Sequence, residues 1–176
     1  MSNTRVVTGR VRFSFPHVFN PFAMEGQAPK YSVQLLIPKT DVETVQAIRS
    51  AIEAAKQEGV IKFGGKVPAI LKTPLRDGDL EKPDREEYKG HYFMSCSSKT
   101  RPGVVDRNRQ PILDETDVYG GCYGRVSLNF YAFNTSGNKG IACGLNNLQK
   151  LEDGESFGGK SSAFSDFSSG DDDFLN

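Results

Sequence analysis

The chain has 176 residues, of which 37% are hydrophobic, and its 22 acidic side chains balance 22 basic ones. This length is typical of one domain, and 18 glycines with nine prolines favour a turn-rich β protein over a helical bundle. No apolar run is long enough to span a membrane and the N-terminus lacks the apolar segment of a signal peptide, so we expect a soluble intracellular protein.

The charge is divided into two opposite blocks. From residue 152 onward there are seven acidic residues and one basic residue, a net charge of −6, and residues 1–151 carry the balancing +6. Residues 154–170 are rich in glycine and serine, which is typical of a flexible linker. The sequence therefore predicts a folded domain over 1–151 and a disordered acidic tail over 152–176, with a tip formed by Asp171, Asp172, Asp173 and Phe174.

Alternating apolar and polar residues predict five or six strands, the clearest over residues 11–15, 31–37, 91–98, 123–133 and 141–145. In the first strand, Val11, Phe13 and Phe15 form the apolar face. Residues 134–140 are rich in Asn, Gly and Ser, which predicts a hairpin turn between the last two strands.

One helix is predicted after the second strand. Thr40 and Glu43 have the spacing of a capping box, and Gly59 suits the C-terminal end. One face of the helix carries the apolar residues Val45, Ile48, Ile52 and Ala55. A few strands and one helix in about 150 residues fit a small, mainly β, partly open barrel.

Few features of the sequence support a catalytic site or a metal site. Cys96, Cys122 and Cys143 are far apart in the sequence and are expected to be reduced and partly buried. Six carboxylates between residues 77 and 87 suggest a two-metal nuclease, but the bases among them favour a solvated charged loop. Residues 154–161 match the phosphate-loop pattern without the helix that must follow it. We expect no metal site and no cofactor.

The outward face of the strand at 123–133 is better suited to nucleic acid. It carries Arg125, Asn129 and Tyr131, and arginine attracts phosphate while tyrosine offers a ring on which any base can stack. Arg10 and Arg12 lie on the polar face of the first strand. On spacing alone, the alternative is equally good: the rings cap a small second core and the arginines keep the surface soluble.

Several segments resemble a phage-encoded single-stranded-DNA-binding protein family, namely residues 12–15, 30–33, 36–39, 99–106, 123–133 and 144–148. The resemblance implies an OB-fold, a partly open antiparallel Greek-key barrel, which coats single strands without enzymatic activity during replication or recombination. The candidate nucleic-acid-binding residues are then Arg10, Arg12, Tyr31, Tyr92, Lys99, Arg101, Arg107, Arg109, Tyr123, Arg125, Asn129 and Tyr131. The predicted helix departs from the resemblance, because an OB-fold usually places it between the third and fourth strands.

The acidic tail closing on Phe174 resembles tails that recruit replication proteins such as a polymerase or a primase-helicase. The expected place of action is the cytoplasm of the bacterial host cell. The alternatives are an annealing recombination mediator that also binds duplex DNA, a metal-dependent phage nuclease, and a protein-interaction adaptor. A homodimer also stays open at this point.

Overall fold

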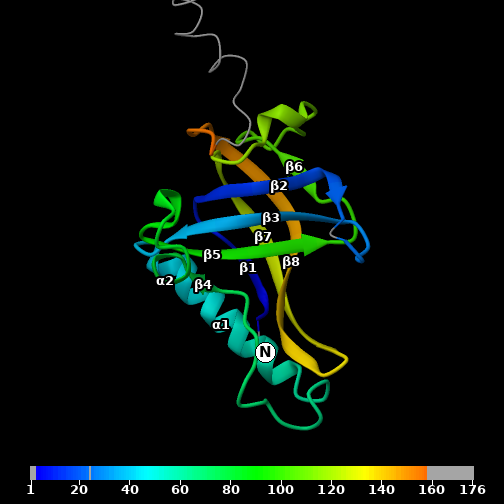
Figure 1. Ribbon diagram of the computed structural model, residues 1–176. Coiled ribbons are helices and arrows are strands. Elements are labelled where there is room, and N and C mark those ends of the chain that lie inside the picture. The colour runs from blue at the N-terminus through cyan, green and yellow to red at the C-terminus, as the bar shows by residue number, and fades with distance from the viewer. Residues whose placement is uncertain (1–2, 24, 158–176) are drawn as a thin grey trace, which may run out of the picture.

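A computed structural model gives the fold, and it describes residues 3–23 and 25–157 (Figure 1). Five long strands form a barrel: β2 (Val11–Phe22), β3 (Lys30–Pro38), β5 (His91–Ser98), β7 (Tyr123–Thr135) and β8 (Asn138–Glu152). β2, β3 and β5 form an antiparallel meander, β8 lies parallel to β5, and β7 pairs with both β8 and β2. This is the predicted mainly β, OB-like barrel.

The barrel is closed by short seams. β5 meets β8 at the pair Ser97 and Gly144, whereas β7 and β8 pair along the length of their hairpin. β2 meets β7 at two residue pairs, one of which includes Gly124. A Cβ at Gly124 would lie 2.6 Å from Cε2 of Phe13, so glycine is needed for the two strands to approach each other. The short seams make the barrel partly open, as predicted.

The interior is filled by alternate side chains of the barrel strands. On β7, the face predicted to be apolar is buried: Val126, Leu128, Phe130 and Ala132. All three cysteines are buried and free, in agreement with the sequence-based expectation. The predicted hairpin turn is formed by Ser136 (φ 53°) and Gly137 (φ 87°), the two positive φ angles that a type I′ turn requires.

The helix α1 (Val42–Glu58) lies between β3 and β5 in the chain and covers one end of the barrel, against β7 and β1 (Figure 1). Its predicted apolar residues are buried. The predicted capping box is wrong by one residue, because Asp41 is the N-cap and its Oδ1 accepts a hydrogen bond from Thr44 N at 3.2 Å. No helix in residues 3–23 and 25–157 is long and apolar enough to cross a membrane.

Short elements that the sequence did not reveal complete the fold. They are β1 (Arg5–Val7) beside β7, β4 (Arg76–Asp77) beside β5, β6 (Gly103–Val105) parallel to β8, α2 (Gly78–Glu81), η1 (Glu86–Tyr88) and η2 (Glu115–Asp117). Elements of two to four residues are too short to show a hydrophobic period. β4, α2 and η1 lie in the polar connection between α1 and β5, which is therefore more ordered than its composition suggested.

Candidate nucleic-acid interface

An irregularity in β2 turns an aromatic side chain outward. Ser14 pairs with Gln34 and His17 pairs with Ser32, so β2 contains one more residue than β3 over this interval. Phe15 takes a positive φ of 48° and its side chain is 59% exposed. The prediction that Phe15 shares the apolar face with Phe13 is therefore wrong. Strict alternation fails because a bulge re-aims the side chains that follow it.

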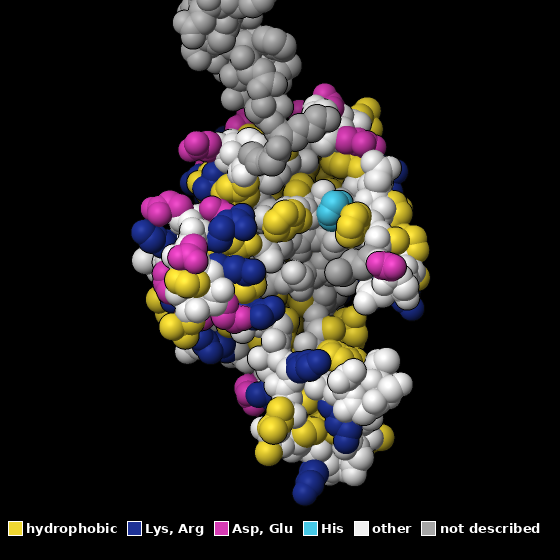
Figure 2. All heavy atoms as spheres, in the orientation of Figure 1, with side chains coloured by type: hydrophobic (Ala, Val, Ile, Leu, Met, Phe, Trp, Pro, Cys, Tyr) yellow, Lys and Arg dark blue, Asp and Glu magenta, His cyan; other side chains and the backbone are white. Residues whose placement is uncertain are grey.

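Phe15, His17 and Phe22 line one groove on the outer face of the barrel. The rings of His17 and Phe22 are stacked, with centroids 4.7 Å apart and planes at 18°. The groove has a volume of about 560 Å³, and its other lining residues are Gln27, Ala28, Lys30, Ser32, Val33, Gln34, Ser95 and Ser97. Figure 2 shows this face, with a histidine beside hydrophobic side chains.

The groove combines the groups that bind a single strand of nucleic acid. Phe22 is 53% exposed, so it and Phe15 present ring surface to solvent. Lys30 supplies a cation, and none of the described lining residues is acidic. Exposed rings stack on bases of any sequence, and a cation next to them attracts the phosphates.

The floor of the groove is held in place by a neighbouring apolar cluster. Tyr88 OH donates a hydrogen bond of 2.6 Å to Oε1 of Gln34, and burial raises the pKa of Tyr88. Tyr88 packs with Leu36 and Phe93, and Phe157 covers the three; we call these four residues the outer apolar cluster. Leu36 follows Gln34 by two residues on β3, so the cluster adjoins the groove on the same face of the sheet.

Three of the predicted binding residues meet where β2 and β7 begin. The guanidinium carbons of Arg10 and Arg12 lie 4.2 Å and 5.1 Å from the ring centroid of Tyr123. Arg10 also forms an ion pair with Glu152, and Nε of Arg12 donates to Gly121 O at 2.8 Å. Cations and a ring are thus assembled at one place, beside the outer apolar cluster.

Three further predicted residues lie elsewhere on β7. Nε of Arg125 donates to Thr8 O at 3.3 Å, and Thr4 Oγ1 donates to Oδ1 of Asn129 at 3.2 Å, so both side chains are engaged by the segment around β1. Tyr131 is further along the strand toward the hairpin and is 42% exposed. None of the three lines the groove.

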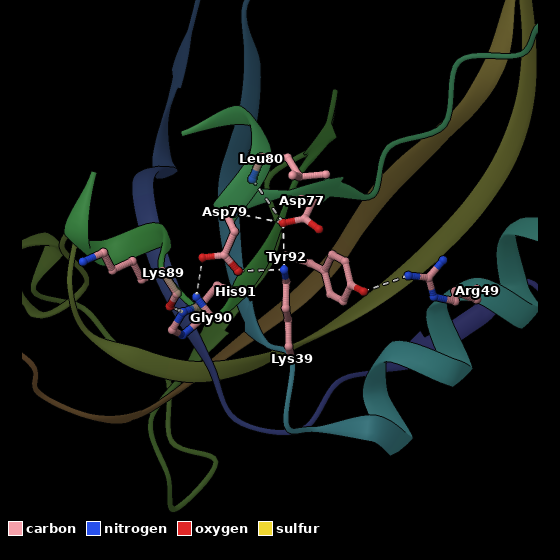
Figure 3. Close-up of polar contacts among 9 residues, drawn as sticks. All are labelled: Lys39, Arg49, Asp77, Asp79, Leu80, Lys89, Gly90, His91 and Tyr92. Atoms are coloured by element: carbon pink, nitrogen blue, oxygen red, sulfur yellow. Dashed lines mark hydrogen bonds and ion pairs between the residues drawn. The ribbon is translucent and has the colours of Figure 1, made fainter. Parts of the chain in front are cut away.

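Tyr92 belongs to a polar network at the other end of β5 (Figure 3). Its hydroxyl accepts a hydrogen bond of 3.1 Å from Arg49 on α1. Beside it, Lys39 Nζ lies 2.8 Å from Asp77 Oδ1 and 2.7 Å from Asp79 Oδ2. These hydrogen bonds raise the pKa of Lys39 to about 12 and hold the pKa of both carboxyl groups below its ordinary value. The network ties the 76–81 segment to the barrel.

The remaining predicted residues are dispersed. Tyr31 is half-buried on the same side of β3 as the core residue Val33. Four exposed basic residues lie in the segment after β5, namely Lys99, Arg101, Arg107 and Arg109, and the guanidinium of Arg101 is 5.9 Å from the ring centroid of Phe19. The predicted partner-binding residues Asp171, Asp172, Asp173 and Phe174 lie outside the described residues.

Five of the six carboxylates at 77–87 form ion pairs. Glu81 pairs with Arg76 and Glu87 with Arg85, in addition to the two aspartates that contact Lys39. Within the described residues, no group of three His, Cys, Asp or Glu side chains is placed to hold a metal ion. The arrangement fits a charged loop stabilised by its own basic residues and by Lys39 at the end of β3.

Sequence reasoning missed Phe15, His17, Phe22 and Lys30 as groove residues. A signal was present in Pro16 and Pro21, because proline has no N–H for a central strand and marks bulges and edges. The predicted strand over residues 11–15 is too short, because β2 continues through both prolines to Phe22 with two register shifts.

The barrel has five strands and is partly open, and an aromatic groove crosses three adjacent strands. These features are those of an OB-fold protein, a class that binds ligands on this face of the barrel. The family model for the ssDNA-binding protein of Enterobacter phage Enc34 matches residues 4–175, and the chain belongs to this family. Protein p50 of Acyrthosiphon pisum secondary endosymbiont phage 1 is 34% identical over 166 residues, which cover 88% of this chain and 87% of that protein.

Solved structures agree with this assignment. The single-stranded DNA-binding protein from bacteriophage Enc34 in complex with ssDNA is 30% identical, with a TM-score of 0.80 and coverage of 88% of this chain and 90% of that one. Gp2.5, a single-stranded DNA binding protein encoded by bacteriophage T7, has a TM-score of 0.63 over 92% of this chain and 93% of that one. At 17% identity, the T7 protein supports the fold alone.

Proposed function

We propose that this chain binds single-stranded DNA without sequence preference, across the outer face of β2, β3 and β5. The observation that carries the proposal is the groove of exposed rings, with Phe15, the stacked pair of His17 and Phe22, and Lys30 at its edge. Each stacked base contributes about 1–3 kcal/mol, and the recognition tolerates every base because every base has a π-face. The Enc34 relative solved in complex with ssDNA supports this choice of ligand.

Single-stranded DNA would be bound while the phage genome is replicated or recombined inside the bacterial host cell. In that setting the protein coats exposed single strands and acts as a binding protein, with no catalytic step. The ion pairs within residues 76–89 support a structural role for the carboxylates that suggested a nuclease.

We also propose that the acidic tail recruits replication proteins, such as a polymerase or a primase-helicase, and competes with DNA for the cationic surface of the body. Its net charge of −6 opposes +6 in residues 1–151. A tail on a flexible linker has an effective concentration of about a millimolar at its own body. A bound strand displaces the tail, and Phe174 is then available to an apolar pocket on a partner.

Fluorescence anisotropy with labelled single-stranded, duplex and RNA oligomers tests the main proposal. Phe22→Ala should weaken single-strand binding by about 1–3 kcal/mol and change duplex binding less, because paired bases do not reach the ring. Leu113→Ala is the matched control, since this side chain is 89% exposed and does not line the groove. Equal binding of single strand and duplex, both insensitive to Phe22→Ala, would refute the proposal.

Truncation after Phe157 keeps every described residue and removes the part of the tail over residues 158–176, which carries a net charge of −3. The truncated chain should bind single strands more tightly than the full chain, most of all at low salt, where screening is weakest. Phe174→Ala in the full chain should reduce polymerase binding and leave DNA affinity nearly unchanged. A truncated chain that still binds the polymerase, or that binds DNA no better at low salt, contradicts the respective half.

A further inference from the structure

The residues that follow β8 lie across the barrel face beside the groove. Nη2 of Arg12 donates to Glu155 O at 2.6 Å, and Phe157 N donates to Gly120 O at 2.9 Å. Upstream, Gly154 N donates to the hydroxyl of Tyr119 at 3.0 Å. We call residues 153–157 the strap. It is held by a few hydrogen bonds and one ring, and it belongs to no strand of the barrel.

Phe157 occupies a site with the features of a base-binding pocket. Its ring lies over the guanidinium of Arg12, with 4.2 Å from the guanidinium carbon to the ring centroid. Its other neighbours are the buried residues Leu36, Tyr88 and Phe93 of the outer apolar cluster. Arginine planes and apolar side chains are the surfaces on which proteins stack unpaired bases. The ring of Phe157 is thus placed as a base would be.

Arg12 is prepared for a nucleotide once the strap has left. Its Nε bonds to Gly121 O at 2.8 Å, which belongs to the body and fixes the guanidinium plane. Its Nη2 bonds to the strap carbonyl of Glu155, and a phosphate oxygen is a stronger acceptor for the same N–H. When the strap leaves, a DNA phosphate therefore replaces the Glu155 carbonyl as the acceptor for Arg12, and a base replaces the ring of Phe157.

The charges around this site do not oppose that exchange. A cavity of about 420 Å³ at the strap is lined by Arg12, Glu86 and Glu87 of the body, and by strap residues. Glu87 pairs with Arg85, and Glu86 Oε2 lies 3.2 Å from Nζ of Lys89. Both carboxylates are thus matched by a cation, and the carboxylate of Glu155 leaves with the strap.

The site continues the groove. Gln34 lines the groove and is hydrogen-bonded to Tyr88, which also packs under Phe157. Ser14 and Arg12 follow each other on the same face of β2, opposite Gln34 and Leu36 of β3. A single strand of DNA that lies along this face reaches the Phe157 site directly after the groove.

We propose that the position of Phe157 is an additional nucleotide subsite, in which a base of single-stranded DNA stacks on Arg12 and its phosphate bonds to the guanidinium, and that Phe157 is the internal occupant displaced on binding. The proposal rests on single-strand binding in the groove. It differs from competition by the acidic tail, because it depends on one ring and not on charge.

Phe157→Trp tests the displacement directly, since the chain has no other tryptophan and its emission reports this position alone. Binding is followed independently by the anisotropy of a labelled oligo-dT. We expect the emission to shift to the red, toward hydrated indole, as the oligomer saturates the protein. Unchanged emission, or a blue shift from a ring that stays and is covered by DNA, overturns the proposal. An oligomer that does not bind at all contradicts the proposed function instead.

Phe157→Ala gives the second measurement. It should raise single-strand affinity between about twofold and thirtyfold, the range for one cation–π contact from an exposed to a desolvated site, without changing the net charge. Arg12→Gln should remove most of that gain when the two changes are combined. A gain that persists with Arg12→Gln shows that the base does not stack on Arg12, and no gain in the single variant shows that the strap is only a structural anchor; either result overturns the proposal.

Discussion

Phe15 offers a test that separates backbone strain, which should affect stability, from ring stacking, which should affect DNA binding. Its φ of 48° lies in the left-handed region, which costs about 1–2 kcal/mol for a residue with a Cβ. The side chain is 59% exposed, so its burial offsets little of that cost. A strained, exposed aromatic ring beside a groove is the pattern expected where conformation serves binding.

The perturbation is a pair of substitutions, Phe15→Ala and Phe15→Gly. Alanine keeps the backbone strain, whereas glycine removes about 1–2 kcal/mol of it and adds about 0.5–1 kcal/mol of unfolded-state entropy. The glycine variant should therefore be more stable than the alanine variant by roughly 0.5–1 kcal/mol, a difference in Tm of about 1–4 °C at this chain length. Both variants lack the ring and should lose about 1–3 kcal/mol of single-strand affinity.

Urea unfolding followed by circular dichroism measures the stability difference, and anisotropy with an oligo-dT measures the affinity. Leu113→Ala serves again as the control for loss of an exposed apolar side chain. If the alanine variant is as stable as the glycine variant, the backbone at Phe15 is not strained. If both bind DNA like the parent chain, the ring does not stack on bases.

Three further predictions concern charge, pH and packing. Lys30→Ala should reduce the slope of log affinity against log salt by about 0.7, the value for one phosphate contact, whereas Arg125→Ala should leave the slope unchanged; salt titrations that show the reverse would place the strand on β7. Lys39→Met should flatten the pH dependence of unfolding free energy at both ends. The two aspartates bonded to Lys39 have lowered pKa values, so their contribution is present above 3.8 and is lost as the pH falls through those values. Lys39 has a pKa raised to about 12, so its contribution is complete below 10.5 and is lost as the pH approaches 12; identical pH profiles of parent and variant would contradict the assignment. Gly124→Ala should destabilise the barrel by about 1–3 kcal/mol or more, because the added Cβ meets backbone and the ring of a core phenylalanine, and a variant with the parent's urea midpoint would contradict the crowding seen at this seam.

The parts of the fold that follow from local periodicity could be predicted from the sequence. The buried face of β7 and the apolar face of α1 have side chains at the regular spacing of a strand and a helix, and both are buried as expected. The position of α1 between the second and third barrel strands was also predicted, although it departs from the usual OB arrangement. Asp41 as N-cap was missed because two adjacent capping residues compete and the backbone conformation decides between them.

The candidate site was harder to predict, because it depends on where regularity fails. The bulge at Phe15 changes which side of the sheet each following residue faces, and alternation alone cannot show that. Arg12 was predicted from the polar face of its strand, but its contact with the strap joins residues 12 and 157, far apart in the sequence. Long-range contacts of this kind leave no periodic signal.

The most direct test of the central claim is a photo-cross-link between the protein and a single strand carrying 5-iododeoxyuridine at successive positions, with the attached peptides identified by mass spectrometry. Binding across β2, β3 and β5 predicts cross-links at Phe15, His17 and Phe22 of the groove. Cross-links confined to the β7 peptide around Arg125 and Tyr131, with none in the groove, would contradict it.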